Sequence, residues 1–327
     1  MFINKLKKAK VIDMYSKLSD YIIKNFGNES LIESIKEYFA ELASNRCIVS
    51  IMGEIQDSKD QLKENINIIT LYINKIMFII QNIKFGKECD NCKIEFIWND
   101  TIKGNIWHSY NIWFEIYNVL YNLAVSYYCL ASYIAKLSTK KDEHKEATNY
   151  FKNSLYIFNL IKEEATNKIP KNELPIDLYP GYLSYYMYLC EIQGNLEIYK
   201  IAKEACPKEL FLHSKLALAI SNLYKKARSL SNELETKDGF PDYIIQYLEN
   251  RVYFYKSVVN RDLRDGYKKK FDESGEGYGE MILHQDLLIK SLLDCQKNIT
   301  KCGKFVDIEQ IQKEIDEELS KKKKCML

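Results

Sequence analysis

The sequence is poor in the residues that interrupt helices. It has 5 prolines and 12 glycines in 327 residues, and no proline occurs before Pro170. Proline disrupts helix interiors because it lacks an amide hydrogen and clashes with the preceding turn. Long stretches without proline therefore predict a chain of long helices. No Ser/Gly-rich linker or shift in composition divides the chain, which favours one elongated all-α domain over two separate domains.

Arginine is scarce, and the charges of the chain nearly cancel. Only 5 of the 47 basic residues are Arg, and 47 Lys+Arg against 45 Asp+Glu leave a formal net charge of +2. Nucleic-acid-binding domains are usually basic, and arginine makes many of their forked contacts to phosphates and bases. We therefore expect no nucleic-acid partner.

Long apolar runs and targeting signals are missing as well. The longest apolar region, residues 68–80, is interrupted by Asn74 and Lys75 and is too short to span a bilayer. The first eight residues lack the apolar core of a signal peptide. The nine cysteines are odd in number and scattered, which fits a reducing compartment better than a disulfide framework. These features predict a cytoplasmic protein.

The main pattern in the sequence is helical periodicity, since apolar residues recur three and four positions apart along most of the chain. Residues 93–98 alternate instead and predict a minor β-strand or hairpin near 93–100. Residues 107–137 are apolar nearly all round, so this helix is expected in the middle of the fold. The predicted helices are 13–26, 30–44, 58–84, 107–137, 142–166, 181–204, 208–235, 241–271, 278–299 and 305–324.

Residues 142–166 are the expected antiparallel partner of helix 107–137. Small residues such as Ala124 and Ala131 permit a close crossing, as in the stacked helix pairs of tetratricopeptide-like solenoids. The predicted contact face on the partner helix consists of Tyr150, Ser154, Ile157, Phe158 and Ile161.

No arrangement of residues in the sequence indicates catalysis. Cys89 and Cys92 have the spacing of a zinc knuckle, but no second pair of ligands accompanies them. The glycine cluster 274–279 lacks the Gly-Lys-Ser/Thr of a phosphate loop, and it predicts a turn between two helices. The four histidines form no known metal or catalytic pattern. We expect no catalytic residue, no cofactor and no metal, and interpret the chain as a binding scaffold.

The C-terminal tail, residues 321–327, is polybasic and contains a cysteine. Four lysines at the end of a helix are most simply a solvated, favourably charged terminus. The alternative is attraction to an anionic membrane, with a lipid on the cysteine as a second anchor. The cysteine is third from the end, where a prenylation box requires the fourth position. The candidate residues are Lys321, Lys322, Lys323, Lys324 and Cys325.

Several segments resemble a known family. Residues 94–100 end in Trp98-Asn-Asp100, similar to a family strand that ends in Trp-Lys-Asp. Residues 114–124 resemble the family helix with Tyr-Glu-x-x-x-Val-Leu-Phe-Asn. Asp177-Leu-Tyr-Pro180 precedes a helix carrying Gln193 and Ala202, and residues 279–282 match a Gly-Glu-x-Ile turn. In order along residues 5–318, these features resemble the BRO (Bro-one) domain of the ALIX type.

The resemblance implies a curved, banana-shaped helical domain, here residues 1–320, followed by the tail. Such domains catalyse no reaction and act as adaptors in endosomal sorting and membrane scission. They bind the C-terminal amphipathic helix of an ESCRT-III subunit of the Snf-seven/charged multivesicular body type, in a hydrophobic groove. The protein would then be cytoplasmic and peripherally recruited to endosomal or other membranes.

The resemblance also implies the groove residues. A groove aromatic corresponds to Ile198 or Tyr199, and two groove aliphatics correspond to Leu212 and Leu216. The two leucines share a helix face, but their stripe continues through Ala219, Leu223 and Ala227, and periodicity alone assigns that stripe to the core. Two other functions stay open, a signalling-scaffold adaptor and a peripheral membrane-binding module.

Overall fold

The computed structural model describes residues 6–26, 29–51, 58–88, 91–238, 240–302, 313, 315–318 and 320. The fold divides into two compact units. Unit 1 comprises residues 1–137 and 149–190, and unit 2 comprises residues 138–148 and 191–327. The domain boundary at residue 320 stays a prediction.

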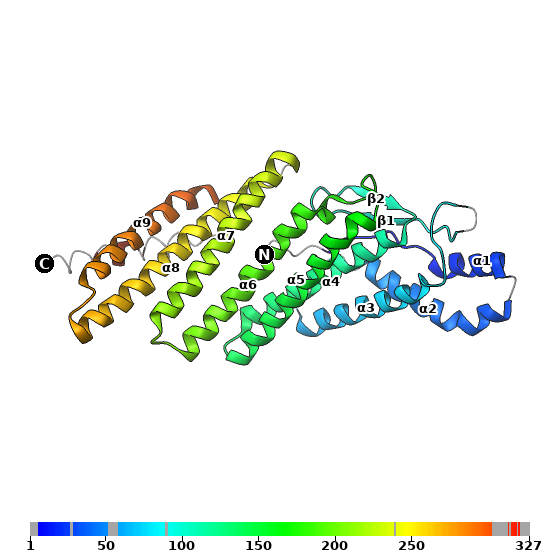
Figure 1. Cartoon of the computed structure of the whole chain (residues 1–327). Helices are drawn as coiled ribbons and strands as arrows, with labels where there is room; N and C mark the ends of the chain where they lie inside the picture. The colour runs from blue at the N-terminus through cyan, green and yellow to red at the C-terminus, as the bar shows by residue number, and fades with distance from the viewer. Residues whose placement is uncertain are drawn as a thin grey trace. The chain divides into compact units, whose positions relative to one another are not determined.

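The described part of unit 1 is mainly helical and contains one small hairpin (Figure 1). Strand β1 (Phe96–Asn99) pairs antiparallel with β2 (Ile106–Ser109), and Trp98 lies opposite Trp107. The helices of this unit are α1 (Met14–Phe26), α2 (Glu29–Ile51), α3 (Lys59–Ile79), α4 (Ile112–Leu137), most of α5 (Lys141–Lys168), the short 3-10 helix η1 (Ile176–Leu178) and the start of α6 (Pro180–Ala205). An all-α fold with a minor hairpin near 93–100 is therefore confirmed.

The prediction that a helix begins at residue 107 is wrong. Residues 106–109 form strand β2 and α4 begins at Ile112. The physical reason is a helix cap, since the Asn111 side chain accepts a hydrogen bond from the Trp113 amide at 2.9 Å. Other boundaries shift by a few residues. Helix α2 continues to Ile51, α3 ends at Ile79 and α8 continues to Ser274.

Helix α4 is buried on nearly every side, as its composition predicted. Helix α5 packs against it in antiparallel register, because Tyr121 contacts Phe158 and Tyr128 contacts Phe151, with ring centroids 5.7 and 5.3 Å apart. The Ser154 hydroxyl donates to the Ala124 carbonyl at 2.8 Å. The close crossing at Ala124 and the contacts of Ser154 and Phe158 with α4 are thus confirmed.

Unit 2 contains α7 (Leu210–Asp238), α8 (Asp242–Ser274) and α9 (Tyr278–Cys302), packed as antiparallel neighbours (Figure 1). Tyr224 of α7 stacks on Tyr255 of α8 with centroids 5.6 Å apart, and Asn250 of α8 donates to the Cys295 carbonyl of α9 at 2.9 Å. The glycine cluster is the α8–α9 turn, where Gly275 has a positive φ of 76° that favours glycine.

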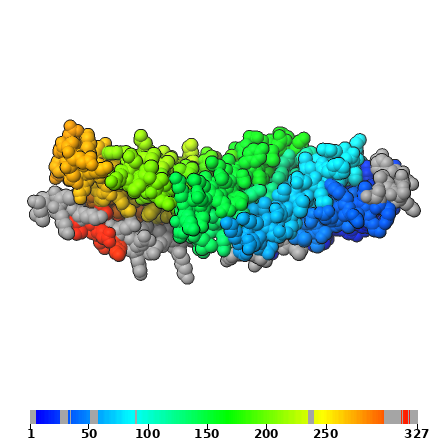
Figure 2. All heavy atoms as spheres, turned by 90° about the horizontal axis from the view of Figure 1, so that it is seen from below, coloured from blue at the N-terminus to red at the C-terminus, as the bar shows by residue number. Residues whose placement is uncertain are grey.

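Residues near the C-terminus pack on α8 and α9. Ile315 is buried with Leu288, Leu292 and Cys295, and Glu318 forms an ion pair with Arg264 of α8. In Figure 2 the described residues between 313 and 320 are red, and those of α8 and α9 are yellow to orange. None of the described helices has the length and apolar character needed to cross a membrane.

Candidate partner-binding surface

Several of the residues that carry the family resemblance belong to buried polar networks in unit 1. The carboxylate of Glu115 on α4 accepts hydrogen bonds from the Trp98 indole at 2.6 Å and from the Tyr72 hydroxyl at 2.9 Å. It also forms an ion pair with Arg46 of α2, whose guanidinium lies over the Trp98 ring. Both charged side chains are fully buried. The network ties α2, α3, β1 and α4 together.

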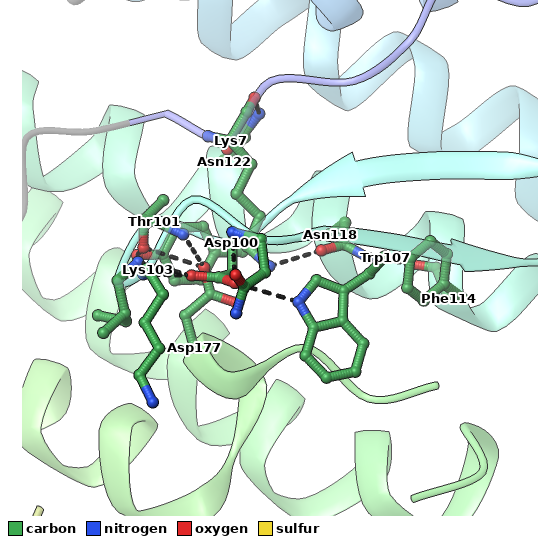
Figure 3. A network of polar contacts seen from close by, with 12 residues as sticks. Lys7, Asp100, Thr101, Lys103, Trp107, Phe114, Asn118, Asn122 and Asp177 are labelled. Carbon is green, nitrogen blue, oxygen red and sulfur yellow. Dashed lines mark hydrogen bonds and ion pairs between the residues drawn. The ribbon is translucent and has the colours of Figure 1, made fainter. Parts of the chain in front are cut away.

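Asp100 organises the hairpin loop (Figure 3). Its carboxylate accepts hydrogen bonds from the four backbone amides of residues 102–105, at 2.6–3.1 Å, and from the Trp107 indole at 3.1 Å. Gly104 takes a positive φ of 73° in the same loop. The aspartate of the Trp-Asn-Asp segment is therefore a structural cap for a tight turn.

The N-terminal arm is fixed through Lys7 (Figure 3). Its ammonium group lies 2.6 Å from Asp177 of η1 and donates to Asn118 of α4 at 2.6 Å. Asn122 of α4 accepts from the Lys7 amide and donates to its carbonyl. Asp177 also accepts from the amide and hydroxyl of Thr101, at 2.7 and 2.9 Å. Burial lowers the pKa of Lys7, while the adjacent Asp177 carboxylate acts in the opposite direction.

These networks have the properties of structural elements. Their carboxylates are enclosed and bonded to protein donors, whereas catalytic groups need access to a substrate. Within the part of the chain that the structure describes, no three His, Cys, Asp or Glu side chains are grouped to hold a metal. Cys89 of the zinc-like pair lies outside the described residues. Burial raises the pKa of Cys92 to about 12.

The predicted groove residues lie in unit 2, on α6 and α7. Leu212 is 42% exposed and Leu216 is partly exposed. Ile198 is 38% exposed, whereas Tyr199 is only 9% exposed. Of the two candidates on α6, Ile198 is thus at the surface and Tyr199 packs inward. The two helices meet here, since the Tyr199 and His213 rings are 6.3 Å apart.

The assignment of the Leu212 stripe to the core from periodicity is wrong. We define the Leu212 stripe as Leu212, Leu216, Ala219 and Leu223, which are all exposed or partly exposed. Ala227, the next residue on the same helix face, is buried. The buried face of α7 carries smaller and more polar residues, with hydroxyls bonded to backbone carbonyls such as that of Val252. These buried residues are His213, Ser214, Ala217, Ile220, Ser221, Tyr224, Ala227, Ser231 and Leu234.

Two buried contacts fix α6 beside the Leu212 stripe. The Tyr199 hydroxyl donates to Asp262 of α8 at 3.1 Å, and desolvation raises the pKa of Asp262. Glu197 is bonded to His144 at 2.5 Å and to Lys200 at 2.8 Å. Ile198 therefore sits between two anchored residues, on a rigid part of α6. Lys321, Lys322, Lys323, Lys324 and Cys325 lie outside the described residues.

A protein-family model described as a BRO1-like domain matches residues 1–324. The chain belongs to the BRO1-like domain family. The family resemblance found over residues 5–318 is confirmed. Domains of this family are ESCRT-associated adaptors without enzymatic activity, which confirms the predicted adaptor class and the prediction that the chain is not an enzyme.

The known proteins that the chain resembles are distant in sequence. Vacuolar protein-sorting protein bro-1 of Neurospora crassa is 23% identical over 283 residues, which cover 86% of this chain and 26% of that protein. The chain thus spans about a quarter of the length of this curated relative.

Two solved structures share the fold. One is the ALIX BRO1 domain in complex with CHMP4C, with a TM-score of 0.75 and 16% identity over 98% of this chain and 86% of that chain. The other is ALIX in complex with the SIVmac239 PYKEVTEDL late domain, with the same TM-score and identity over 98% of this chain and 44% of that chain.

Proposed function

We propose that this BRO1-like domain is an adaptor of endosomal sorting and membrane scission that binds the C-terminal amphipathic helix of an ESCRT-III subunit. The partner is of the Snf-seven/charged multivesicular body type, and the binding site is the Leu212 stripe together with Ile198. Two relatives support this partner class, since one is a vacuolar protein-sorting protein and another is a BRO1 domain in complex with CHMP4C.

The observation that carries the proposal is the exposure of large aliphatic side chains on a helix whose other face is packed. Leu212 and Leu216 are one helical turn apart and accessible, although leaving them exposed forgoes burial worth about 1.5–3 kcal/mol for each complete side chain. An amphipathic helix with apolar residues at i, i+3, i+4 and i+7 would cover such a stripe. The same features support peripheral recruitment to endosomal membranes through the bound partner.

The decisive variant is Leu216→Asp. Central apolar anchors of interfaces often contribute more than about 2 kcal/mol, which corresponds to a roughly 30-fold rise in Kd. We expect this loss in a titration with fluorescent C-terminal helices from a panel of ESCRT-III subunits. Because Leu216 is partly exposed, circular dichroism and the thermal transition should stay close to those of the wild type.

Leu71→Asp is the matched control, because Leu71 is 48% exposed in the middle of α3 in unit 1. This variant should bind the helices as the wild type does. Unfolding of Leu216→Asp would show that the residue belongs to the core. A wild-type protein that binds no helix of the panel would contradict the proposal.

A further inference from the structure

A second apolar stripe lies on the other side of α7. We define the Phe211 stripe as Phe211 and Leu218, which are 42% and 46% exposed and two helical turns apart. Because successive residues of a helix are rotated by about 100° around its axis, Lys215 lies between this stripe and the Leu212 stripe on the helix surface. The Phe211 stripe faces α8, because the Phe211 and Tyr267 rings meet edge to face with centroids 5.3 Å apart.

Phe211 is held in place by a glycine of α8. A Cβ atom at Gly266 would lie 3.1 Å from the Cζ atom of Phe211, so the absence of a side chain lets the ring rest on the α8 backbone. Tyr267 in turn stacks on His284 of α9, with centroids 5.7 Å apart and planes 7° apart. Phe211 is thus part of a wall of rings from three helices, and it does not protrude alone as a lipid-inserting wedge would.

The exposed charges on α7 beside the Phe211 stripe are basic, and acidic residues near the ring contacts include Glu276 and Glu280 at the α8–α9 turn, which act on Lys270 and His284. Helix α7 has no Asp or Glu from Leu210 to Asn232, and Lys215 and Lys225 are exposed there. On α8, one line of residues runs through Tyr267 in alternating steps of four and three positions, and its members are all at least partly exposed and none is acidic. These residues are Lys256, Asn260, Leu263, Tyr267 and Lys270. Lys270 pairs with Glu276 at 3.0 Å at the far end of this line.

We propose that the Phe211 stripe is a second docking site, which takes an acidic amphipathic helix of a partner protein. Apolar side chains of that helix would cover Phe211 and Leu218, while its carboxylates would face the lysines of α7 and α8. A second copy of this chain fits less well, because it would bring like charges together. With the Leu212 stripe also occupied, α7 would lie between two bound helices.

A synthetic probe tests this site without knowledge of the natural partner. The probe is a helical peptide with leucine at i, i+3, i+4 and i+7 and glutamate at its other surface positions, and its control carries lysine in place of glutamate. Calorimetric titration of the full chain should give two bound acidic peptides and little binding of the basic one. Leu218→Asp should bind one peptide, and Leu71→Asp should still bind two.

A second variant acts on the same site from α8. Gly266→Ala should displace the Phe211 ring and weaken binding at the second site at least tenfold, while the alanine is favoured in a helix. The inference is overturned if both Leu218→Asp and Gly266→Ala leave stoichiometry and Kd unchanged. It is also overturned if the basic peptide binds equally well, or if only anionic phosphatidylserine vesicles bind in a Leu218-dependent way.

The second site stands apart from the proposed function. If Leu216→Asp still binds two probes while Leu218→Asp binds one, the Leu212 stripe is not a docking site and the second site stands. If Leu216→Asp binds one probe and Leu218→Asp binds two, the Leu212 stripe is a docking site and the proposed second site is not.

Discussion

Glu115→Gln is the substitution whose effect on stability the structure defines best. The two side chains have nearly the same shape, but the amide carries no charge and replaces an acceptor oxygen by a donor. Arg46, which is fully buried, then loses the carboxylate with which it forms an ion pair. Of the Trp98 indole and the Tyr72 hydroxyl, only one retains an acceptor oxygen on residue 115.

The expected loss in the free energy of unfolding is large compared with the total stability of a domain. Breaking a buried ion pair by removing one charge costs about 3–5 kcal/mol, and a buried donor left without an acceptor costs about 1–3 kcal/mol. Because these terms overlap in one network, we take about 3–5 kcal/mol for the whole change. At about 2–4 °C per kcal/mol for a unit of this size, Tm should fall by about 6–20 °C.

Differential scanning calorimetry and urea denaturation measure this effect. The control is Glu33→Gln in α2, the same chemical change in an ion pair with Lys36 that is mostly exposed, where we expect less than about 1 kcal/mol. A Tm for Glu115→Gln within about 2 °C of the wild type would refute the reasoning, because it would mean that the Arg46 charge is not dependent on Glu115.

Two further predictions concern charge. Desolvation raises the pKa of Asp262 above its usual 3.8. The folded state therefore binds the proton of this carboxyl group more tightly than the unfolded state does. At pH values above the raised pKa, the ionised carboxylate makes the folded state less stable. Asp262→Asn keeps an acceptor oxygen for the Tyr199 hydroxyl. This variant should raise Tm at pH 7 but not at pH values well below 3.8, and a lower Tm at pH 7 would contradict the prediction. Removal of residues 321–327 should reduce the amount of protein that floats with phosphatidylserine vesicles, and the difference between the two forms should shrink in high salt because the Debye length falls. Equal flotation of both forms at low salt would exclude the tail as a membrane contact.

Helix content was predictable because it depends on repeated local features. The scarcity of proline and the apolar spacing predicted long helices, and an apolar composition on all sides correctly placed α4 in the interior. Strand β2 was missed because Ile106 and His108 are exposed and Trp107 is half-buried, so no alternation of apolar residues marks it. Its position depends on pairing with β1 and on the Asn111 cap, neither of which has a strong local signal.

The surface of α7 was harder to predict because its core face is unusually polar. Ser214, Ser221 and Ser231 are buried with their hydroxyls bonded to backbone carbonyls, which removes most of the cost of burying them. A hydropathy pattern does not show that these hydrogen bonds offset the cost of burying serine. The leucines on the other faces of α7 were therefore assigned to the interior. Which of Ile198 and Tyr199 lies at the surface also required coordinates, since Tyr199 is drawn inward by its hydrogen bond to Asp262.

The attachment of the N-terminal arm has a consequence for biosynthesis. The amide of Lys7 bonds to a side chain 115 residues later, and its ammonium group reaches Asp177, which is translated later still. Chains emerge from the ribosome at about 5–20 residues per second, so Lys7 must wait seconds for the side chains that bind it. During that interval an apolar residue such as Leu6, which is buried in the folded protein, is available to chaperones.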